Sequence, residues 1–294
     1  MQIHAYSLTY NYDKDARAPG DIFARMAELS NGFTGIEYLL LESIDDNIRA
    51  TSVLSGVEYG SIKAWLSQVL RGIDDSDLGK LEWKSILGKM LVKAKWAVIR
   101  FLEKDRPAQN KDLVDLQKEL FEYQIETGIK IIPAYRPINL NLMSDRLVMI
   151  NSATTQTSSE ESVILHLDGN PAILSRRLVI TQERKVEILT TEIERFRDKD
   201  TVLVKKPDYL GNSMWDVIYR NHKESMQMGD IEFLTKFHNN ESNAQVHPGD
   251  SLEVEIDGAH SIGNNGETIQ KRFTIRRVSK VIRNRDNQKS IFDV

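Results

Sequence analysis

The most regular hydrophobic pattern in the chain lies between Leu78 and Lys104. Leu87, Leu91 and Val98 recur there at three- and four-residue steps with Ala94, which is the spacing of one face of an amphipathic helix. A second helix is expected from about Lys111 to Thr127. The short segment between the two helices predicts that they form an antiparallel hairpin.

Shorter apolar runs before this hairpin follow strand and helix patterns in turn. We expect a strand over Ile3–Tyr10, a short helix opened by Pro19-Gly20 and ended by turns at Asn31-Gly32 and Gly35, strands over Ile36–Leu41 and Ile48–Leu54, and a helix over Ile62–Leu70. This order predicts an α+β body with a mostly antiparallel sheet.

The last third of the chain reads as short strands broken by tight turns. Leu252 to Ile256 alternates apolar and charged residues, Gly263 to Gly266 predicts a hairpin tip, and Phe273 and Ile275 lie on the returning strand. A helical turn is expected at Ile231, after Gly229-Asp230. Such runs pack as a small, partly closed β-barrel or sandwich.

The fold class expected is therefore α+β, with an N-terminal α/β body and a β-barrel or sandwich module at the C-terminal end. Residues Asn151 to Ser162 are rich in Ser and Thr, a composition typical of loops, while Glu183 to Phe196 fits a helix or a strand. We expect domains at 1–150, with the helical hairpin at 78–127, and at 201–294, joined by a linker and connecting segment at 151–200.

Composition excludes several kinds of site. The 294 residues include no cysteine, so disulfides, zinc–thiolate sites, iron–sulfur clusters and thiol nucleophiles are excluded. The N-terminus lacks a secretory pattern, and no window approaches 18 uninterrupted apolar residues. A cytoplasmic protein without a membrane partner is the expectation.

No catalytic motif is recognisable. The chain lacks G-x-S-x-G, G-x-G-x-x-G and the P-loop pattern, and its six histidines show no metal-binding spacing. Glu82-Trp83-Lys84 matches the E-x-K of a nuclease core, but in a helical context. The acidic residues of one strand have no histidine or lysine at a diagnostic spacing; they are Asp250, Glu253, Glu255 and Asp257. We expect no cofactor and no bound metal.

The helices of the hairpin carry opposite charge. The first has seven basic and two acidic residues between Lys80 and Lys104, a net +5, and the second has two basic and five acidic residues, a net −3. A basic helix of this kind can bind nucleic acid or anionic lipid. The interpretation that we prefer is docking of the two complementary faces within the chain.

The C-terminal stretch is also basic although the whole chain has a net charge of −4. From Glu267 onward eight basic residues face three acidic ones, a net +5. The candidate nucleic-acid-binding residues are Arg272, Arg276, Arg277 and Lys280. The alternatives are a solvated strand edge that resists pairing and a docking face for an acidic partner. Trp83 lies off the main apolar stripe, so it packs inside the chain or forms a protein interface.

Five short stretches of the last third carry a resemblance to known proteins. They are Leu203-Val204-Lys205-Lys206-Pro207-Asp208-Tyr209, Trp215, Asp230 with Phe233-Leu234, Pro248-Gly249-Asp250-Ser251-Leu252, and Phe273-Thr274-Ile275. This order resembles the tail of uncharacterised bacterial proteins, some of which are found in phage-defence or mobile-element loci. The resemblance implies no active site.

The sequence thus favours a non-enzymatic binding or assembly protein, whose partner is another protein or a second copy of itself, through Trp83 or the sheet edges. The first alternative is a nucleic-acid-binding accessory protein of a phage-defence system. The second is a metal-dependent hydrolase whose motif is not recognisable.

Overall fold

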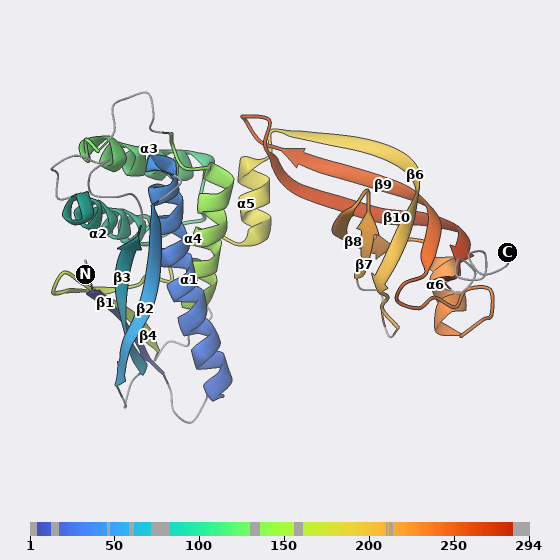
Figure 1. Cartoon of the computed structure of the whole chain (residues 1–294), viewed down its shortest axis with the longest axis horizontal. Helices are drawn as coiled ribbons and strands as arrows, with labels where there is room; N and C mark the ends of the chain where they lie inside the picture. The colour runs from blue at the N-terminus through green and yellow to red at the C-terminus, as the bar shows by residue number, and fades with distance from the viewer. Residues whose placement is uncertain are drawn as a thin grey trace. The chain divides into compact units, whose positions relative to one another are not determined.

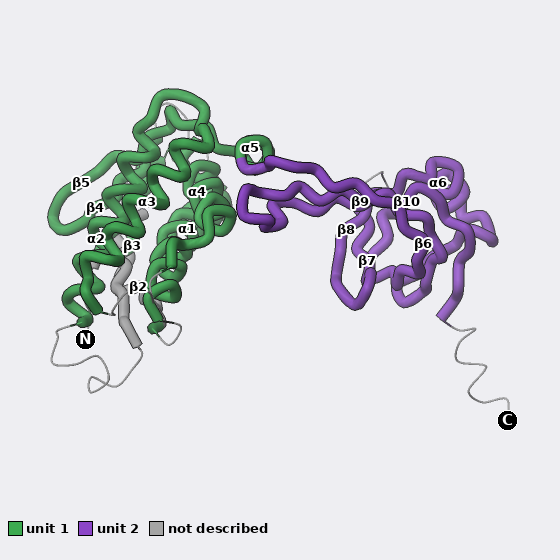
Figure 2. The backbone as a smooth tube through the Cα atoms, turned by 90° about the horizontal axis from the view of Figure 1, so that it is seen from above, with its two compact units in different colours: residues 1–188 green, residues 189–294 purple. Residues whose placement is uncertain are grey.

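The chain divides into two compact units, Met1–Ile188 and Leu189–Val294 (Figure 2). The structure, a computed structural model, describes residues 5–12, 18–45, 48–58, 62–71, 83–129, 136–155, 161–209, 211 and 214–284. The helices and strands of each unit are shown in Figure 1, and each unit is described by itself.

The first unit combines a sheet with a group of helices. Its elements are β1 (Ala5–Asn11), α1 (Pro19–Ile44), β2 (Arg49–Glu58), β3 (Ile62–Arg71), α2 (Trp83–Leu102), α3 (Asn110–Glu126), α4 (Leu140–Thr155), β4 (Ser162–Leu167), β5 (Asn170–Ile173) and α5 (Gln182–Leu189). The strands lie in the order β2-β3-β1-β4-β5, and each neighbouring pair is antiparallel. Tyr6, Leu8 and Tyr10 of the central strand β1 are buried. The antiparallel α+β body predicted from the sequence is confirmed.

The helical hairpin of α2 and α3 is also confirmed. Lys93 Nζ lies 2.5 Å from Glu126 Oε2, and Arg100 Nη2 lies 2.5 Å from Glu119 Oε1. Lys93 precedes Arg100 on α2, whereas their partners Glu126 and Glu119 follow the reverse order on α3. The two helices therefore run antiparallel. Their opposite charges therefore meet within the chain, as the preferred interpretation predicted.

The prediction of a short helix followed by a strand between Pro19 and Leu41 is wrong, because one helix, α1, covers both. Gly32 and Gly35, predicted as turns, lie where α4 approaches most closely. A Cβ atom at Gly32 would overlap the side chain of Ile150, and one at Gly35 would lie 2.5 Å from Arg146 Cδ. These glycines let two helices pack closely and do not end the first.

The predicted helix over Ile62–Leu70 is also wrong. This segment forms β3, which pairs with β1 on one side and β2 on the other. Its apolar residues fit the period of a helix as well as a buried strand, and pairing on both edges decides between them.

The expected linker at 151–200 is replaced by ordered elements. Residues 151–155 end α4, which the sequence analysis did not predict, while 156–160 lie outside the described residues. The Asn151 side chain donates to the Leu178 carbonyl at 2.8 Å and accepts from the Ile180 amide at 2.9 Å. Polar residues that suggested a loop are thus paired inside the unit. The second unit begins near 189 and not at 201, because β6 already starts at Glu192.

The second unit is a closed five-stranded β-barrel. Its elements are β6 (Glu192–Lys206), β7 (Met214–Tyr219), β8 (His222–Met228), α6 (Ile231–His238), β9 (Ser251–Ile262) and β10 (Thr268–Ile282). The order around the barrel is β10-β8-β7-β6-β9, with β9 and β10 also paired. Trp215, Val217, Leu252 and Ile275 lie in its core. The predicted barrel is confirmed, as are the helical turn after Asp230 and the hairpin tip.

The barrel resembles the OB-fold. Its strands β6, β7 and β8 follow one another as a meander, the helix α6 connects the third strand to the fourth, and β8 and β10 pair in parallel. Proteins with that fold bind oligonucleotides or oligosaccharides on one barrel face. A fold alone does not decide function, so the side chains on the barrel surface must be considered.

Candidate nucleic-acid interface

A basic surface of the second unit lies on three long strands. β9 is flanked by β6 along one edge and by β10 along the other, and the three run side by side as a ribbon (Figure 1). Ala259 of β9 has Arg195 of β6 and Arg272 of β10 as its cross-strand partners. Directly opposed residues of antiparallel strands point to the same side of the sheet. The two arginines therefore lie on one face, separated by a small side chain.

We define the basic ribbon face as the outward side chains that border two adjoining depressions on this ribbon, over the stretch of β9 from Glu255 to Ala259. Its charged members are Arg195, Arg197, Lys199, Arg272, Arg276, Glu255 and Asp257. Five cations against two carboxylates leave a net charge of +3. The five basic side chains are all exposed, so they are available to a ligand.

The two carboxylates are held by cations of β6. Arg197 Nε donates to Asp257 Oδ1 at 3.0 Å, and Lys199 Nζ lies 2.9 Å from Glu255 Oε1. The hydrogen bond from Lys199 and its charge, followed by the charges of Arg277 and Arg276, lower the pKa of Glu255 despite some desolvation. Both pairs are exposed, and such pairs contribute little and exchange readily for other partners.

Arg195 and Arg272 have no ion pair with any residue that the structure describes. Arg272 Nε donates to the amide oxygen of Gln270 at 2.9 Å, a neutral partner. These two guanidinium groups border an open depression of about 590 Å³, in which Thr274 and Asp257 also take part. A neighbouring depression of about 200 Å³ is bordered by Arg276 and shares Arg197 with the first. The face therefore offers a continuous, positively charged surface.

The opposite side of the ribbon is packed and holds the strands in place. The Phe196 ring makes edge-to-face contacts with His260 and Phe273, with centroids 5.1 and 6.3 Å apart. A Cβ atom at Gly258 would overlap the Phe196 ring, so only glycine leaves room for it. Asp198 Oδ2 accepts from the Tyr219 hydroxyl at 2.6 Å, and burial together with this bond raises the pKa of Tyr219 to about 12. These contacts hold in place the strands that carry the basic ribbon face.

The structure divides the four basic residues singled out in the sequence. Arg272 and Arg276 belong to the basic ribbon face. Arg277 lies opposite Glu255 of that face, but with Lys280 it borders a second hollow beside α6. Two β-bulges, between Ile275 and Arg277 and between Val278 and Lys280, interrupt the strand where this division occurs.

Three basic residues of the face were not identified as candidates from the sequence. Arg195, Arg197 and Lys199 lie on β6, in a region that was split between a helix and a domain boundary. Their spacing of two residues, with Phe196 and Asp198 between them, was the available signal for a strand with one basic face.

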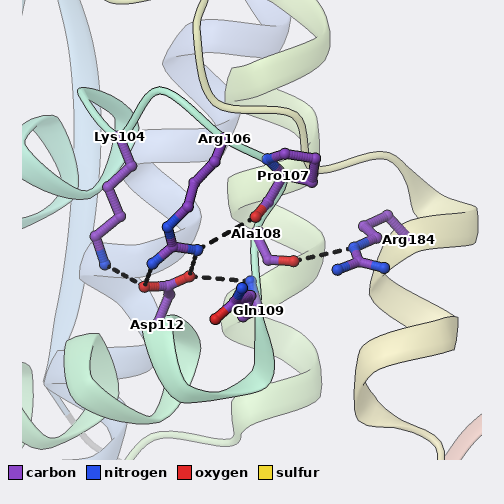
Figure 3. Close-up of polar contacts among 7 residues, drawn as sticks. All are labelled: Lys104, Arg106, Pro107, Ala108, Gln109, Asp112 and Arg184. Atoms are coloured by element: carbon purple, nitrogen blue, oxygen red, sulfur yellow. Dashed lines mark hydrogen bonds and ion pairs between the residues drawn. The ribbon is translucent and has the colours of Figure 1, made fainter.

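A dense polar cluster of the first unit surrounds Asp112 (Figure 3). Its carboxylate accepts from Lys104 Nζ at 2.7 Å, from Arg106 at 2.6 and 2.7 Å, and from the Gln109 amide at 3.0 Å. Burial of the carboxyl acts to raise its pKa, but these bonds outweigh burial and lower it. Because Gln109 is the N-cap of α3, the cluster fixes the start of a helix and leaves no free oxygen lone pair directed at a substrate.

Three of the four acidic residues singled out on β9 and just before it have structural partners; they are Asp250, Glu255 and Asp257. Asp250 is 6% exposed and accepts from the amides of His247 and Asn284. Across the described ranges, no group of three or more histidine or acidic residues is placed to hold a metal ion. The E-x-K match falls at the start of α2, and Glu82 lies outside the described residues.

The interface assignment of Trp83 is not supported. Its side chain is only 2% exposed, so it packs inside the first unit, which is the other alternative that its position suggested. The buried face of α2 is wider than the apolar stripe seen in the sequence, because it also includes Trp83 and Lys95.

Comparisons of the chain with protein-family models, curated proteins and solved structures gave no significant match. Among the described helices, none is both long enough and apolar enough to cross a membrane. The function is therefore inferred from the geometry of the barrel unit.

Proposed function

We propose that the protein is a non-enzymatic nucleic-acid-binding protein and that it binds the phosphate backbone along the basic ribbon face. The observation that carries the proposal is the pair Arg195 and Arg272, exposed on both sides of Ala259 and without an acidic partner among the described residues. Uncompensated cations on one face are the electrostatic footprint of a nucleic-acid-binding surface.

The arrangement favours a sequence-independent mode of binding. Alternate residues of one strand are about 6.6–6.8 Å apart, so Arg195, Arg197 and Lys199 form an evenly spaced row that can follow a backbone. The face carries no aromatic side chain on which bases could stack, since Phe196 and Phe273 point to the packed side. Phosphate contacts without base contacts position a nucleic acid but do not select its sequence.

The outer surface of β7 and β8, where OB-folds commonly bind, is a poorer candidate. Asp216 there accepts from Ser225 at 2.8 Å and lies 3.2 Å from Lys223 Nζ, so its charge is balanced locally. The likeness to the OB-fold supports nucleic-acid binding only as an analogy.

The test is a titration of the full chain against a fluorescent single-stranded DNA, a single-stranded RNA and a duplex at several salt concentrations. Binding should weaken as salt increases, with a slope of log K against log salt of up to about −3.5 for single strands if all five cations contact phosphates. The double variant Arg195→Gln/Arg272→Gln should lower the magnitude of this slope by about 1.4.

The matched control is Lys111→Gln/Lys118→Gln, which removes the same charge from the exposed surface of α3 in the first unit. It should bind like the wild type. No binding to any of the three probes at low salt, or an equal loss in both double variants, would contradict the proposal.

A further inference from the structure

A hollow of about 330 Å³ lies between β10 and α6 in the second unit. Its volume is at the lower end of the range for small-molecule sites. Arg277, Lys280 and Lys236 contribute positive charge to its wall, and Asp230 and Glu232 contribute negative charge. We call it the α6 hollow.

Both carboxylates of the hollow are already engaged. Asp230 Oδ1 accepts from the Phe233 amide at 3.0 Å, and Oδ2 accepts from the Val278 amide at 2.9 Å. Glu232 Oε1 pairs with Lys236 Nζ at 2.6 Å. Since Asp230 caps the helix and also fixes β10, its charge serves the fold.

Arg277 and Lys280 of β10 lie directly opposite Glu255 and Glu253 of β9. Arg277 and Lys280 are exposed, and neither forms an ion pair or hydrogen bond with a residue that the structure describes. Ser279 lies between them on β10, and Asn243 faces them across the hollow from the segment after α6. Two cations with a hydroxyl and an amide are a donor set suited to the oxygens of a phosphate group.

The lining of the hollow is mainly polar, and a smaller part of its wall is apolar. Phe233 and Ala244 are buried there at 9% and 1% exposure, and Val278 is packed against the barrel core. The polar lining can hold the charged end of a ligand, and the smaller apolar part can contact a less polar body.

We propose that the α6 hollow binds a phosphate monoester carried on a nucleoside, with Arg277 and Lys280 on the phosphate. The source can be a free mononucleotide or the terminal phosphate of an oligonucleotide, which present the same group. The site does not depend on the basic ribbon face, because a free nucleotide can occupy it whether or not the ribbon binds a strand.

Isothermal titration calorimetry of the full chain with adenosine 5′-monophosphate and with adenosine is the first test. The monophosphate should bind and adenosine should not. The Arg277→Gln/Lys280→Gln variant should lose at least about tenfold in affinity, the value of one charge-assisted hydrogen bond. Lys280→Arg, which keeps the charge, should retain binding.

A second arm compares an oligonucleotide bearing a 5′-phosphate with the same oligonucleotide bearing a 5′-hydroxyl. A preference for the phosphorylated strand that disappears in Arg277→Gln/Lys280→Gln supports the terminal phosphate as the source. The control Arg272→Gln/Arg276→Gln alters the ribbon and should keep this preference even if it weakens overall binding. The inference is overturned if neither the monophosphate nor the 5′-phosphate gives binding that depends on Arg277 and Lys280.

Discussion

Lys95 differs from an ordinary lysine because it is buried and its pKa is lowered. It lies on α2 at 2% exposure, pairs with Glu37 of α1, and places its Nζ 4.6 Å from the centroid of the Tyr6 ring on β1. Burial lowers the pKa of Lys95 to about 7. One side chain therefore connects three elements of the first unit, and its protonation is linked to their stability.

The sign of this linkage predicts how stability depends on pH. Above pH 7 the folded chain has lost the Lys95 proton, while the unfolded chain keeps it to about pH 10.5. Unfolding takes up a proton in this window, so the free energy of unfolding should rise with pH, by at most about 1.4 kcal/mol per pH unit from this group. Urea unfolding followed by circular dichroism between pH 7 and 10 measures it.

The control for Lys95 is Lys95→Met/Glu37→Leu, which replaces the pair by apolar side chains and should show a flatter pH profile. Below pH 7, where Lys95 is charged, the single variant Lys95→Met should lose about 3–5 kcal/mol, because it leaves the Glu37 carboxylate buried without its cation. Parallel pH profiles for the wild type and the double variant would contradict the lowered pKa.

At the scale of elements, the start of α3 depends on Asp112. Asp112→Asn should reduce the free energy of unfolding by about 2–4 kcal/mol, since it removes a charged acceptor from two cations and weakens the capping box. The lowered pKa of Asp112 adds stability above the unfolded value near 3.8, and that stability is lost as the pH falls toward the folded value. Denaturant unfolding at pH 7 and at about pH 2.5, below the unfolded value, measures both effects.

Asp115→Asn is the matched control for this cluster, because Asp115 is exposed on the same helix and makes no interaction with the described residues. It should change stability little. An equal loss in the two variants would show that Asp112 acts only through its charge and not through its position at the helix start.

Elements with one consistent pattern could be predicted from the sequence, whereas elements decided by distant partners could not. Alternation in Leu252–Ile256 predicted β9, because a half-buried strand leaves a period of two. The segment of β3 has no such pattern, and its pairing with β1 and β2 determines its structure. The basic ribbon face likewise depends on the register of β6 against β9, and 64 residues separate Arg195 from Ala259. The basic composition of the C-terminal stretch identified Arg272 and Arg276 as candidates. Arg195 is recognised as part of the same face only from the pairing of β6 with β9.

At the scale of the whole molecule, the division near residue 189 predicts that residues 189–294 fold on their own. The barrel core is formed entirely by side chains of the second unit, from Val202 to Ile275. The isolated segment should give the circular dichroism of a β protein, dispersed amide resonances and a cooperative thermal transition. An unfolded spectrum would contradict the assignment of the barrel as an independent domain.

The barrel closes unevenly around its circumference. Within the described residues, β10 meets β8 only at Thr274 with Gln227 and at Ile275 with Met228, whereas it follows β9 along its whole length. If the hydrogen bonds at these two residue pairs broke, the barrel would open into a curved five-stranded sheet. Trp215 and the core residues around it would then be exposed to solvent. This seam is therefore where backbone amides of the barrel would exchange with heavy water first, ahead of those shared by β9 and β10.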